Sequence, residues 1–457
     1  MVVDLPLFYV YFIYIINFIL SKLLVKSKML LREKILIQTI LFLLWVGSIN
    51  YSVIYYLGLH QKGELLAKTI NLSINFVIFI IVSTFLFSHY KIHKKINLPK
   101  LQVFWLLVGV IMLMSIGSLI QLKFRDVIPS FLRFTNYFGI FIIGYNIKKE
   151  YHPSYCIRIL NPFIILSVIS CLCFGFLEIF TNDIQYLNNA YRVSGSFKFH
   201  QLAFGMFLFT IITCVIFLKY NANDKILKKI IFGVVLALLL YLFMRVHSRL
   251  LSLSLFSTLL AVSFIGSKQL LAKVKIMTAT MFLLVTGLFL MFNFDFQPRL
   301  KNLLLSRNNS GFVDSSSKTR LDIINNSLAA IDEVDVLFGK GLGTFNGFYE
   351  KAGLKKGVAA HNNYLLFFIE GGMVALAAFI LFEFIMMIKF FKTIKNCHNI
   401  KYESDKKLLF AAATLFIGIE FLGFLLNNYY FYQSETIIWL LLGFCGPFLE
   451  RKVKIHV

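Results

Sequence analysis

Four arginines that stand in short polar stretches beside apolar runs are the first candidates for chemistry. They are Arg133 in SFLRFTNY, Arg192 in YRVSGSF, Arg249 in VHSRLL and Arg320 in SSSKTRL. A charge at membrane depth costs about 2.5–3.5 kcal/mol on insertion scales, so it usually faces a partner or a watery cavity. Guanidinium stays charged and binds phosphate oxygens in a two-pronged way. As a set these arginines suit a pyrophosphate group, whereas any one alone could simply reach lipid headgroups.

A histidine stands directly before a later apolar run. His361 occurs in AHNNYLL, where Asn362 is a candidate helix cap or hydrogen-bond partner. An imidazole titrates near neutral pH and can accept a proton from a hydroxyl group. On spacing alone an ordinary interfacial histidine explains the residue at least as well. His200 and His247 carry the same ambiguity in weaker contexts.

Three alternating glycines, Gly339, Gly341 and Gly343, form the segment GKGLGTF. No strand precedes it, it lacks the G-x-G-x-x-G pattern, and no P-loop lysine-hydroxyl pair follows, so a nucleotide site is rejected. The pattern favours a tight turn. A nest of backbone N–H groups facing an anion is the less favoured alternative.

Carboxylates also occur inside apolar runs. Glu370 lies nine residues beyond His361, Glu383 follows in the same apolar run, and Glu420 lies in the next one. An intramembrane carboxylate is a functional candidate by default, although pairing with an arginine is the plainer explanation.

The composition identifies the class of protein that must position these residues. The 457 residues are 58% hydrophobic and 15% charged, against roughly 25% charged in soluble domains. The net charge of +24 comes from lysines and arginines in short gaps between apolar runs, which indicates membrane topology and lipid headgroups rather than nucleic acid. Six cysteines fall in or beside apolar runs, without disulfide or metal-ligand spacing. The start MVVDLPLFYV lacks a positive n-region, which favours a retained helix over a cleaved signal peptide.

Apolar runs of about 20 residues predict transmembrane helices. Thirteen candidates cover residues 7–25, 35–57, 69–87, 101–122, 127–147, 157–180, 200–218, 230–244, 250–266, 276–293, 363–388, 408–427 and 435–449. Alternate short gaps hold 28 against 9 lysines and arginines. Because positive loops stay in the cytoplasm, this bias predicts that the N-terminus and the long loop are outside and the C-terminus inside.

We therefore expect an all-α polytopic membrane protein with about 12–13 transmembrane helices and one large extracytoplasmic loop containing short amphipathic helices. Its parts are an N-terminal bundle (1–293), the loop (294–362) and C-terminal helices (363–457). Within the loop, a helix over about 320–332 would place Leu321, Ile324, Leu328 and Ile331 on one face. That face should lie on the membrane surface or on the mouth of the bundle.

An ordered set of short motifs resembles a known family. In chain order the motifs are Arg192-Val-Ser-Gly195-Ser-Phe197, Ser248-Arg249, Arg320 at the start of an amphipathic helix, GKGLGTF, and His361-Asn362 leading to Glu370-Gly371. This order resembles the O-antigen ligase and O-antigen polymerase superfamily of bacterial envelope proteins, over roughly residues 190–385. One departure follows Phe197, where His200-Gln201 replace the Pro-Asn frequent in the family. The amide is retained there without the proline kink.

The resemblance implies a metal-independent, inverting glycosyltransferase of the bacterial inner membrane that acts on its outer face. The donor would be a glycan on undecaprenyl pyrophosphate, with no cofactor and no metal. Arg192 and Arg320 would contact the pyrophosphate or the transition state, and His361 would lie nearest the chemistry. Further substrate contacts would come from Arg249, Arg133, Gln201, Glu370, Gly341 and Asn362.

The same resemblance leaves the acceptor open. Polymerase activity, with another lipid-linked repeat unit as acceptor, is favoured because polymerases commonly are aromatic-rich and poor in motifs. Ligase activity toward a lipid A core sugar is the alternative. A polysaccharide flippase is less favoured because repeated halves and broken midplane helices are not visible. Expected partners are the lipid-linked oligosaccharide, membrane lipids and a chain-length-determining membrane protein, and not nucleic acid.

Overall fold

The computed structural model describes residues 29–56, 60–120, 124–181, 185–187, 190–197, 201–221, 224–246, 248–267, 315–351, 360, 362–421 and 432–450. The chain is an all-α polytopic membrane protein, as the sequence predicted, with one short antiparallel strand pair. The elements of the N-terminal part are α2 (Met29–Tyr56), α3 (His60–His93), α4 (Gln102–Ile120), α5 (Phe124–Glu150), α6 (Pro153–Phe180), β1 (Gln185–Leu187), β2 (Ala190–Arg192), η1 (Gly195–Phe197), α7 (Gln201–Cys214), η2 (Val215–Lys219), α8 (Ile226–Arg245) and α9 (Arg249–Gly266). The later elements are α12 (Ser315–Ala329), α13 (Glu333–Phe338), α14 (Phe345–Lys351), α15 (Asn363–Lys395), η3 (Cys397–Asn399), α16 (Glu403–Leu415), η4 (Phe416–Phe421) and α17 (Tyr432–Leu449).

Among the described residues, eight helices are long and apolar enough to cross a membrane: α2 to α6, α7 with its π-helical continuation η2, α8 and α15. Two shorter apolar helices cover Leu251–Gly266 and Ser434–Leu449. The predicted spans 7–25 and 276–293 lie outside the described residues, as does part of 408–427. The division into three domains therefore stays a prediction.

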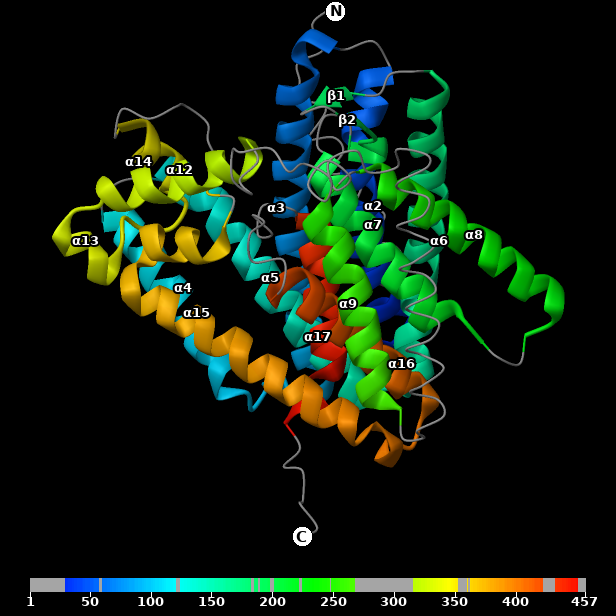
Figure 1. The fold of residues 1–457 in the computed structure, drawn as a ribbon. Helices are drawn as coiled ribbons and strands as arrows, with labels where there is room; N and C mark the ends of the chain where they lie inside the picture. The colour runs from blue at the N-terminus through cyan, green and yellow to red at the C-terminus, as the bar shows by residue number, and fades with distance from the viewer. Residues whose placement is uncertain are drawn as a thin grey trace, which may run out of the picture.

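The helices form an upright bundle in which the two ends differ (Figure 1). The end of α2, the start of α3 and the strands β1 and β2 lie at the upper end. The connections from α3 to α4, α5 to α6 and α15 to α16 lie at the lower end. These lower connections belong to the gaps rich in lysine and arginine. The orientation predicted from those charges stays a prediction.

Close packing of α5 against α17 holds the centre of the bundle. Gly144 and Gly443 face each other, and a Cβ atom on Gly443 would overlap the carbonyl oxygen of Phe141. Helices in a membrane associate through such small residues because lipid tails provide no hydrophobic drive between them. The stacked rings of Tyr137 and Trp439, 6.2 Å apart between centroids, continue the same interface.

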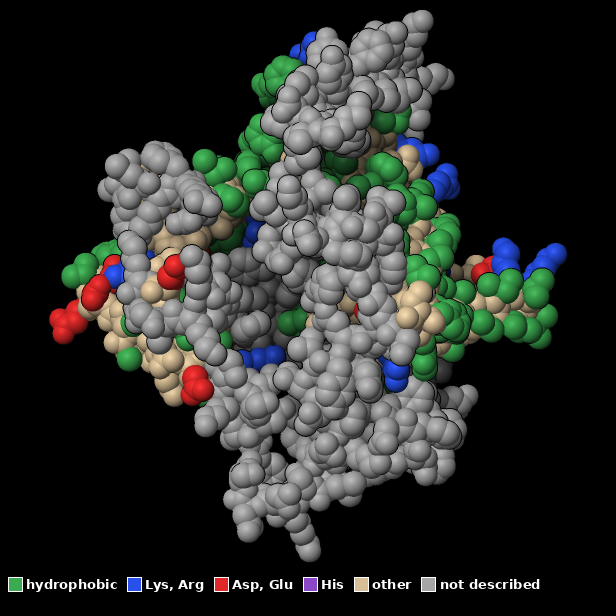
Figure 2. All heavy atoms as spheres, turned by 90° about the horizontal axis from the view of Figure 1, so that it is seen from above, with side chains coloured by type: hydrophobic (Ala, Val, Ile, Leu, Met, Phe, Trp, Pro, Cys, Tyr) green, Lys and Arg blue, Asp and Glu red, His purple; other side chains and the backbone are tan. Residues whose placement is uncertain are grey.

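Helix α8 stands apart from the bundle (Figure 1). Only 17% of its apolar stretch is buried inside the protein. Figure 2 shows lysine or arginine side chains beside apolar ones at its free end. The residues there are the exposed Ile226 and Leu227 with Lys228 and Lys229. Apolar flanks with a basic tip are typical of a helix that faces lipid and ends at the headgroups.

The helices α12 and α14 pack on the first part of α15 through a small separate core. Its buried members are Ile323, Phe345, Tyr349, Ala360, Leu365, Leu366 and Ile369. The predicted apolar face of the loop helix is only partly the buried one, because Ile324 and Ile331 join this core while Leu321 and Leu328 are about half exposed. The helix also begins earlier than predicted, at Ser315.

Candidate active site

The segment that follows Arg192 is fixed by contacts to three helices. The N–H of Val193 donates to the carbonyl oxygen of Arg245 at 3.1 Å, at the end of α8. The hydroxyl of Ser52 on α2 donates to the carbonyl oxygen of Gly195 at 2.6 Å. Gly195 has a φ of +48° and packs against the ring of Phe204 on α7, so a side chain has no room there. Such a φ is uncommon for residues other than glycine.

A buried carboxylate completes this fixation. Glu178, at 0% exposure on α6, accepts the N–H of Ser194 at 2.8 Å, the N–H of Gly195 at 2.6 Å and the Ser194 hydroxyl at 2.8 Å. Hydrogen bonds to a charged group contribute about 1.5–3 kcal/mol each. Sequence reasoning missed Glu178 because it lies in the apolar run 157–180, and its presence inside a span was the available signal.

These contacts place two of the predicted arginines on neighbouring segments. Arg192 ends β2, one residue before Val193, and Arg249 begins α9, four residues after Arg245. Arg245 was not singled out from the sequence. Its side chain is half-buried in the last turn of α8, and its Nε atom has no hydrogen-bond partner among the described residues. A half-buried guanidinium with donors to spare is a further candidate for an anion contact.

The glycine segment is a turn that docks on a break in α15. Gly372 has φ +65° and ψ −166°, so α15 consists of two helices joined at this residue. The carbonyl oxygens of Ile369 and Glu370, released at the break, accept the N–H groups of Lys340 and Gly341, each at 2.8 Å. Exposed carbonyls at a helix end need such partners. These two amides therefore face the protein, and the turn interpretation of GKGLG is the one that the geometry supports.

The same turn also contacts α4. The N–H of Leu342 donates to the carbonyl oxygen of Met114 at 3.2 Å, and the Ser118 hydroxyl donates to the carbonyl oxygen of Leu342 at 3.0 Å. Gly341, with φ +96°, lies so close that a Cβ atom would overlap the Ser118 hydroxyl. The alternating glycines are thus explained by left-handed backbone and close approach together.

The side chain of Glu370 caps the N-terminus of α14. It is 3% exposed, and its Oε1 atom accepts the N–H of Phe345, the first residue of α14, at 3.1 Å. A carboxylate at a helix N-terminus satisfies a free amide and interacts favourably with the helix dipole. The structure therefore joins two predicted residues, Gly341 and Glu370, in one backbone-linked unit.

Lys340 ties the turn to α13. Its ammonium group binds the Asp332 carboxylate at 2.6 Å and also pairs with Asp335. The hydrogen bond from Lys340 and its charge lower the pKa of Asp332. Partial burial alone would lower the pKa of Lys340, but the hydrogen bonds to both carboxylates outweigh it and raise that pKa.

Most of the remaining predicted residues lie on helices of the described part of the chain. Arg320 is half-buried on α12, and Arg133 is half-buried on α5. Gln201 is half-buried in the first turn of α7. Asn362 caps α15, its Oδ1 atom accepting the N–H of Leu365 at 3.1 Å. His361 lies outside the described residues.

Asn363, two residues beyond His361, is a candidate that sequence reasoning treated only as a cap. It is fully buried, and both polar atoms of its side-chain amide are without a partner within the described part of the chain. Buried amides are almost always hydrogen-bonded, since an unpaired one costs free energy. Asn363 is therefore suited to hold a polar ligand.

One known protein family matches part of the chain. The family model described as O-antigen ligase matches residues 229–380. The match supports membership of the O-antigen ligase and polymerase superfamily. Members of this superfamily are glycosyltransferase-like enzymes, and the apolar helices of the present chain make it a multi-pass membrane protein. No curated protein matches the chain.

The O-antigen ligase match coincides with the architecture of the site. It begins in α8 and ends in α15, beyond the break at Gly372, so it includes the glycine turn, Arg249 and Arg320. Arg192 and Glu178 lie before it. The segment that follows Arg192 contacts α8 through Val193, and Glu178 binds the same segment at Ser194 and Gly195.

Proposed function

We propose that this protein is an O-antigen polymerase of the bacterial inner membrane. It would transfer a glycan from undecaprenyl pyrophosphate to another lipid-linked repeat unit at the outer face. The O-antigen ligase match over residues 229–380 is the observation that carries the proposal. The fixed backbone around Val193 and Gly341 supports it, because an enzyme of this kind must hold its charged groups in place before the donor arrives.

The proposed reaction is a direct displacement with inversion. A hydroxyl oxygen of the acceptor forms a bond to the anomeric carbon of the donor sugar while the bond to the pyrophosphate oxygen breaks. The hydroxyl proton passes to His361 or to water, and the pyrophosphate leaves with the bonding pair. Arg192 and Arg320 neutralise the charge that develops on it, so that no metal is required. General-base assistance of this type contributes about 10²–10⁴-fold.

The outward orientation follows from charge placement. The lysine-rich connections at the lower end of the bundle would face the cytoplasm, which puts the upper end, with β1 and β2, outside. A lipid-linked donor would enter from the outer leaflet. A chain-length-determining membrane protein is the proposed partner, and nucleic acid is not expected.

Ligase activity is the second candidate, because the matching family model is described as O-antigen ligase. The two activities differ in the acceptor alone. A deletion strain separates them on a lipopolysaccharide gel. A single band of core plus one repeat unit means polymerase, whereas bare core with accumulated lipid-linked polymer means ligase. Loss of all extracytoplasmic lipid-linked units would instead indicate a flippase and end the proposal.

Individual residues are tested by complementing that strain. Alanine at Arg192, Arg320 or His361 should reproduce the deletion pattern while membrane levels stay normal. Arg158→Ala is the matched control, since Arg158 is exposed at the start of α6, near the opposite end of the bundle. Normal ladders from all three site variants would refute the assignment. Chain growth on purified enzyme in EDTA tests whether a metal is needed, and NMR of the new linkage tests inversion.

A further inference from the structure

A buried cluster at the lower end of the bundle is unrelated to the site described above. Glu33 is 2% exposed in the first turns of α2, and His89 and His93 lie four residues apart near the end of α3, at 0% and 15% exposure. Residues four apart share one helix face. The glycine turn packs on the other end of the neighbouring α4, at Met114 and Ser118.

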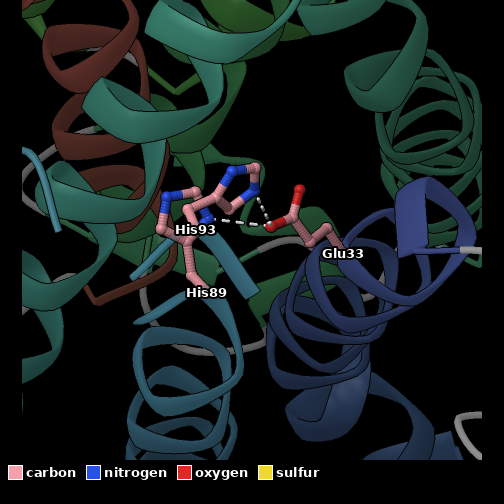
Figure 3. Close-up of side chains that lie close together, drawn as sticks. All are labelled: Glu33, His89 and His93. Carbon is pink, nitrogen blue, oxygen red and sulfur yellow. Dashed lines mark hydrogen bonds and ion pairs between the residues drawn. The ribbon is translucent and has the colours of Figure 1, made fainter. Parts of the chain in front are cut away.

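Both imidazole rings face the same carboxylate oxygen (Figure 3). The Nδ1 atom of His89 lies 2.8 Å from Oε1 of Glu33, and the Nε2 atom of His93 lies 3.7 Å from that oxygen. One ligand atom from each of the three residues falls within 4.8 Å of the other two. The ring centroids of His89 and His93 are 4.2 Å apart.

These separations suit a transition-metal ion. Zinc takes histidine nitrogen and carboxylate oxygen at about 2.0–2.2 Å in a tetrahedral arrangement, which sets neighbouring ligand atoms roughly 3.4 Å apart. The separations of 2.8 and 3.7 Å between the histidine nitrogens and Oε1 of Glu33 lie on either side of that value. The Nε2 atoms of both histidines are buried and have no hydrogen-bond partner among the described residues. Each ring therefore has a nitrogen that can still bind a ligand.

The surroundings supply the outer contacts that a metal site requires. The Tyr151 hydroxyl, from the connection between α5 and α6, donates to Oε2 of Glu33, the oxygen that faces away from the histidines. Ligating carboxylates are usually held by such a partner.

From this geometry we propose a zinc-class divalent metal site formed by Glu33, His89 and His93, with a water or other exogenous ligand in the fourth position. It would bind α2 to α3 at the predicted cytoplasmic end, outside the glycan site. The competing occupant is a proton, which would turn the same cluster into a carboxylate–imidazolium pair.

The test uses the full chain, purified in detergent without a histidine tag, and zinc or cobalt chloride alone. We expect one tightly bound zinc per chain by competition with a chromophoric chelator, and the visible absorption of tetrahedral Co²⁺. Glu33→Gln and His93→Gln should each weaken zinc binding at least tenfold, and Tyr151→Phe by about 10–100-fold, the range for outer contacts. His398→Gln should bind as the wild type does, because His398 is exposed on η3.

The proposal fails if wild type binds no zinc, or if the double variant Glu33→Gln/His93→Gln binds it equally well. The first result would leave the proton as occupant, and the second would place the metal elsewhere. Size-exclusion profiles identify variants that do not fold. If the other variants do not fold, His93→Gln and Tyr151→Phe together decide the outcome. His93 is the most exposed of the three side chains, so its replacement disturbs the core least. None of these readouts depends on glycan transfer, so the two proposals fail separately.

Discussion

The N–H of Gly341 donates a 2.8 Å hydrogen bond to the carbonyl oxygen of Glu370. Through this bond the turn of the loop and the first half of α15 form one unit, because the Glu370 side chain also accepts the N–H of Phe345. The break at Gly372 frees the carbonyl that makes the contact. A bond between residues 29 positions apart therefore sets where the start of α15, with Asn363, stands relative to the turn.

Replacing Gly341 by alanine should detach the turn. The new Cβ atom would overlap the Ser118 hydroxyl, and the φ of +96° costs a residue with a side chain about 1–3 kcal/mol. We expect a lower melting temperature in detergent and at least a tenfold loss of O-polymer in the complemented deletion strain. Gly347→Ala is the control, since no atom lies within 4 Å of its added Cβ. Equal behaviour of the two variants would mean that the docked turn is not needed.

Glu178→Gln should loosen the segment that carries Arg192 without unfolding the bundle. An amide offers one acceptor oxygen in place of two, so its NH₂ group must face a donor from Ser194 or Gly195. Polymer length and amount should fall at least tenfold at normal membrane levels. Glu403→Gln, at a position 72% exposed on α16, should be silent. A normal ladder from Glu178→Gln would show that this carboxylate does not position the arginine segment.

The fold was predictable from the sequence to a large extent because a membrane span needs a long apolar run. The expected spans 101–122, 127–147 and 157–180 correspond to α4, α5 and α6. The break in α15 was not predicted. Two adjacent glycines suggest flexibility, but their conformation depends on a turn about 30 residues earlier in the chain.

The site was less predictable, because its contacts join distant segments. The motif around Val193 was visible, whereas its anchors Glu178 and Arg245 looked like ordinary residues near the ends of two spans. The loop helix shows the same limit. Its 3.6-residue periodicity identified Leu321 and Leu328 as inward-facing, but α15 packs on the neighbouring stripe around Ile323.

The ion pairs of Lys340 should make the turn sensitive to acid. A carboxylate whose pKa is lowered on folding contributes stability above its ordinary value of 3.8, and that stability is lost as pH falls through the folded pKa. The pKa of Lys340 is raised on folding, so this group contributes stability below its ordinary pKa of 10.5. That stability is lost as the pH rises through the folded pKa. NMR titration of labelled aspartate should therefore place the Asp332 midpoint below 3.8. In Lys340→Met it should move upward, and an unchanged midpoint would contradict the pairing.

A buried ion pair at the lower end gives a prediction independent of the site. Lys148 and Asp405 lie 2.9 Å apart at 9% and 5% exposure, linking α5 to α16. Asp405→Ala should destabilise the protein by about 3–5 kcal/mol, because it strands a buried ammonium group. Lys406→Met is the neighbouring control. Its contact to the exposed Glu403 is 3.8 Å long, and such surface pairs contribute about 0–1 kcal/mol.

The double variant Lys148→Met/Asp405→Leu separates two effects: the attraction within the ion pair and the cost of leaving one buried charge unpaired. Removing both groups leaves no unpaired ion, so the protein should regain most of the stability lost in Asp405→Ala, as replaced buried pairs in other proteins do. Thermal or denaturant unfolding of the wild type, Lys148→Met, Asp405→Leu and the double variant in one detergent provides the cycle, and its coupling term isolates the pair. A double variant as unstable as the sum of the single ones would mean that Lys148 and Asp405 act separately, through packing alone.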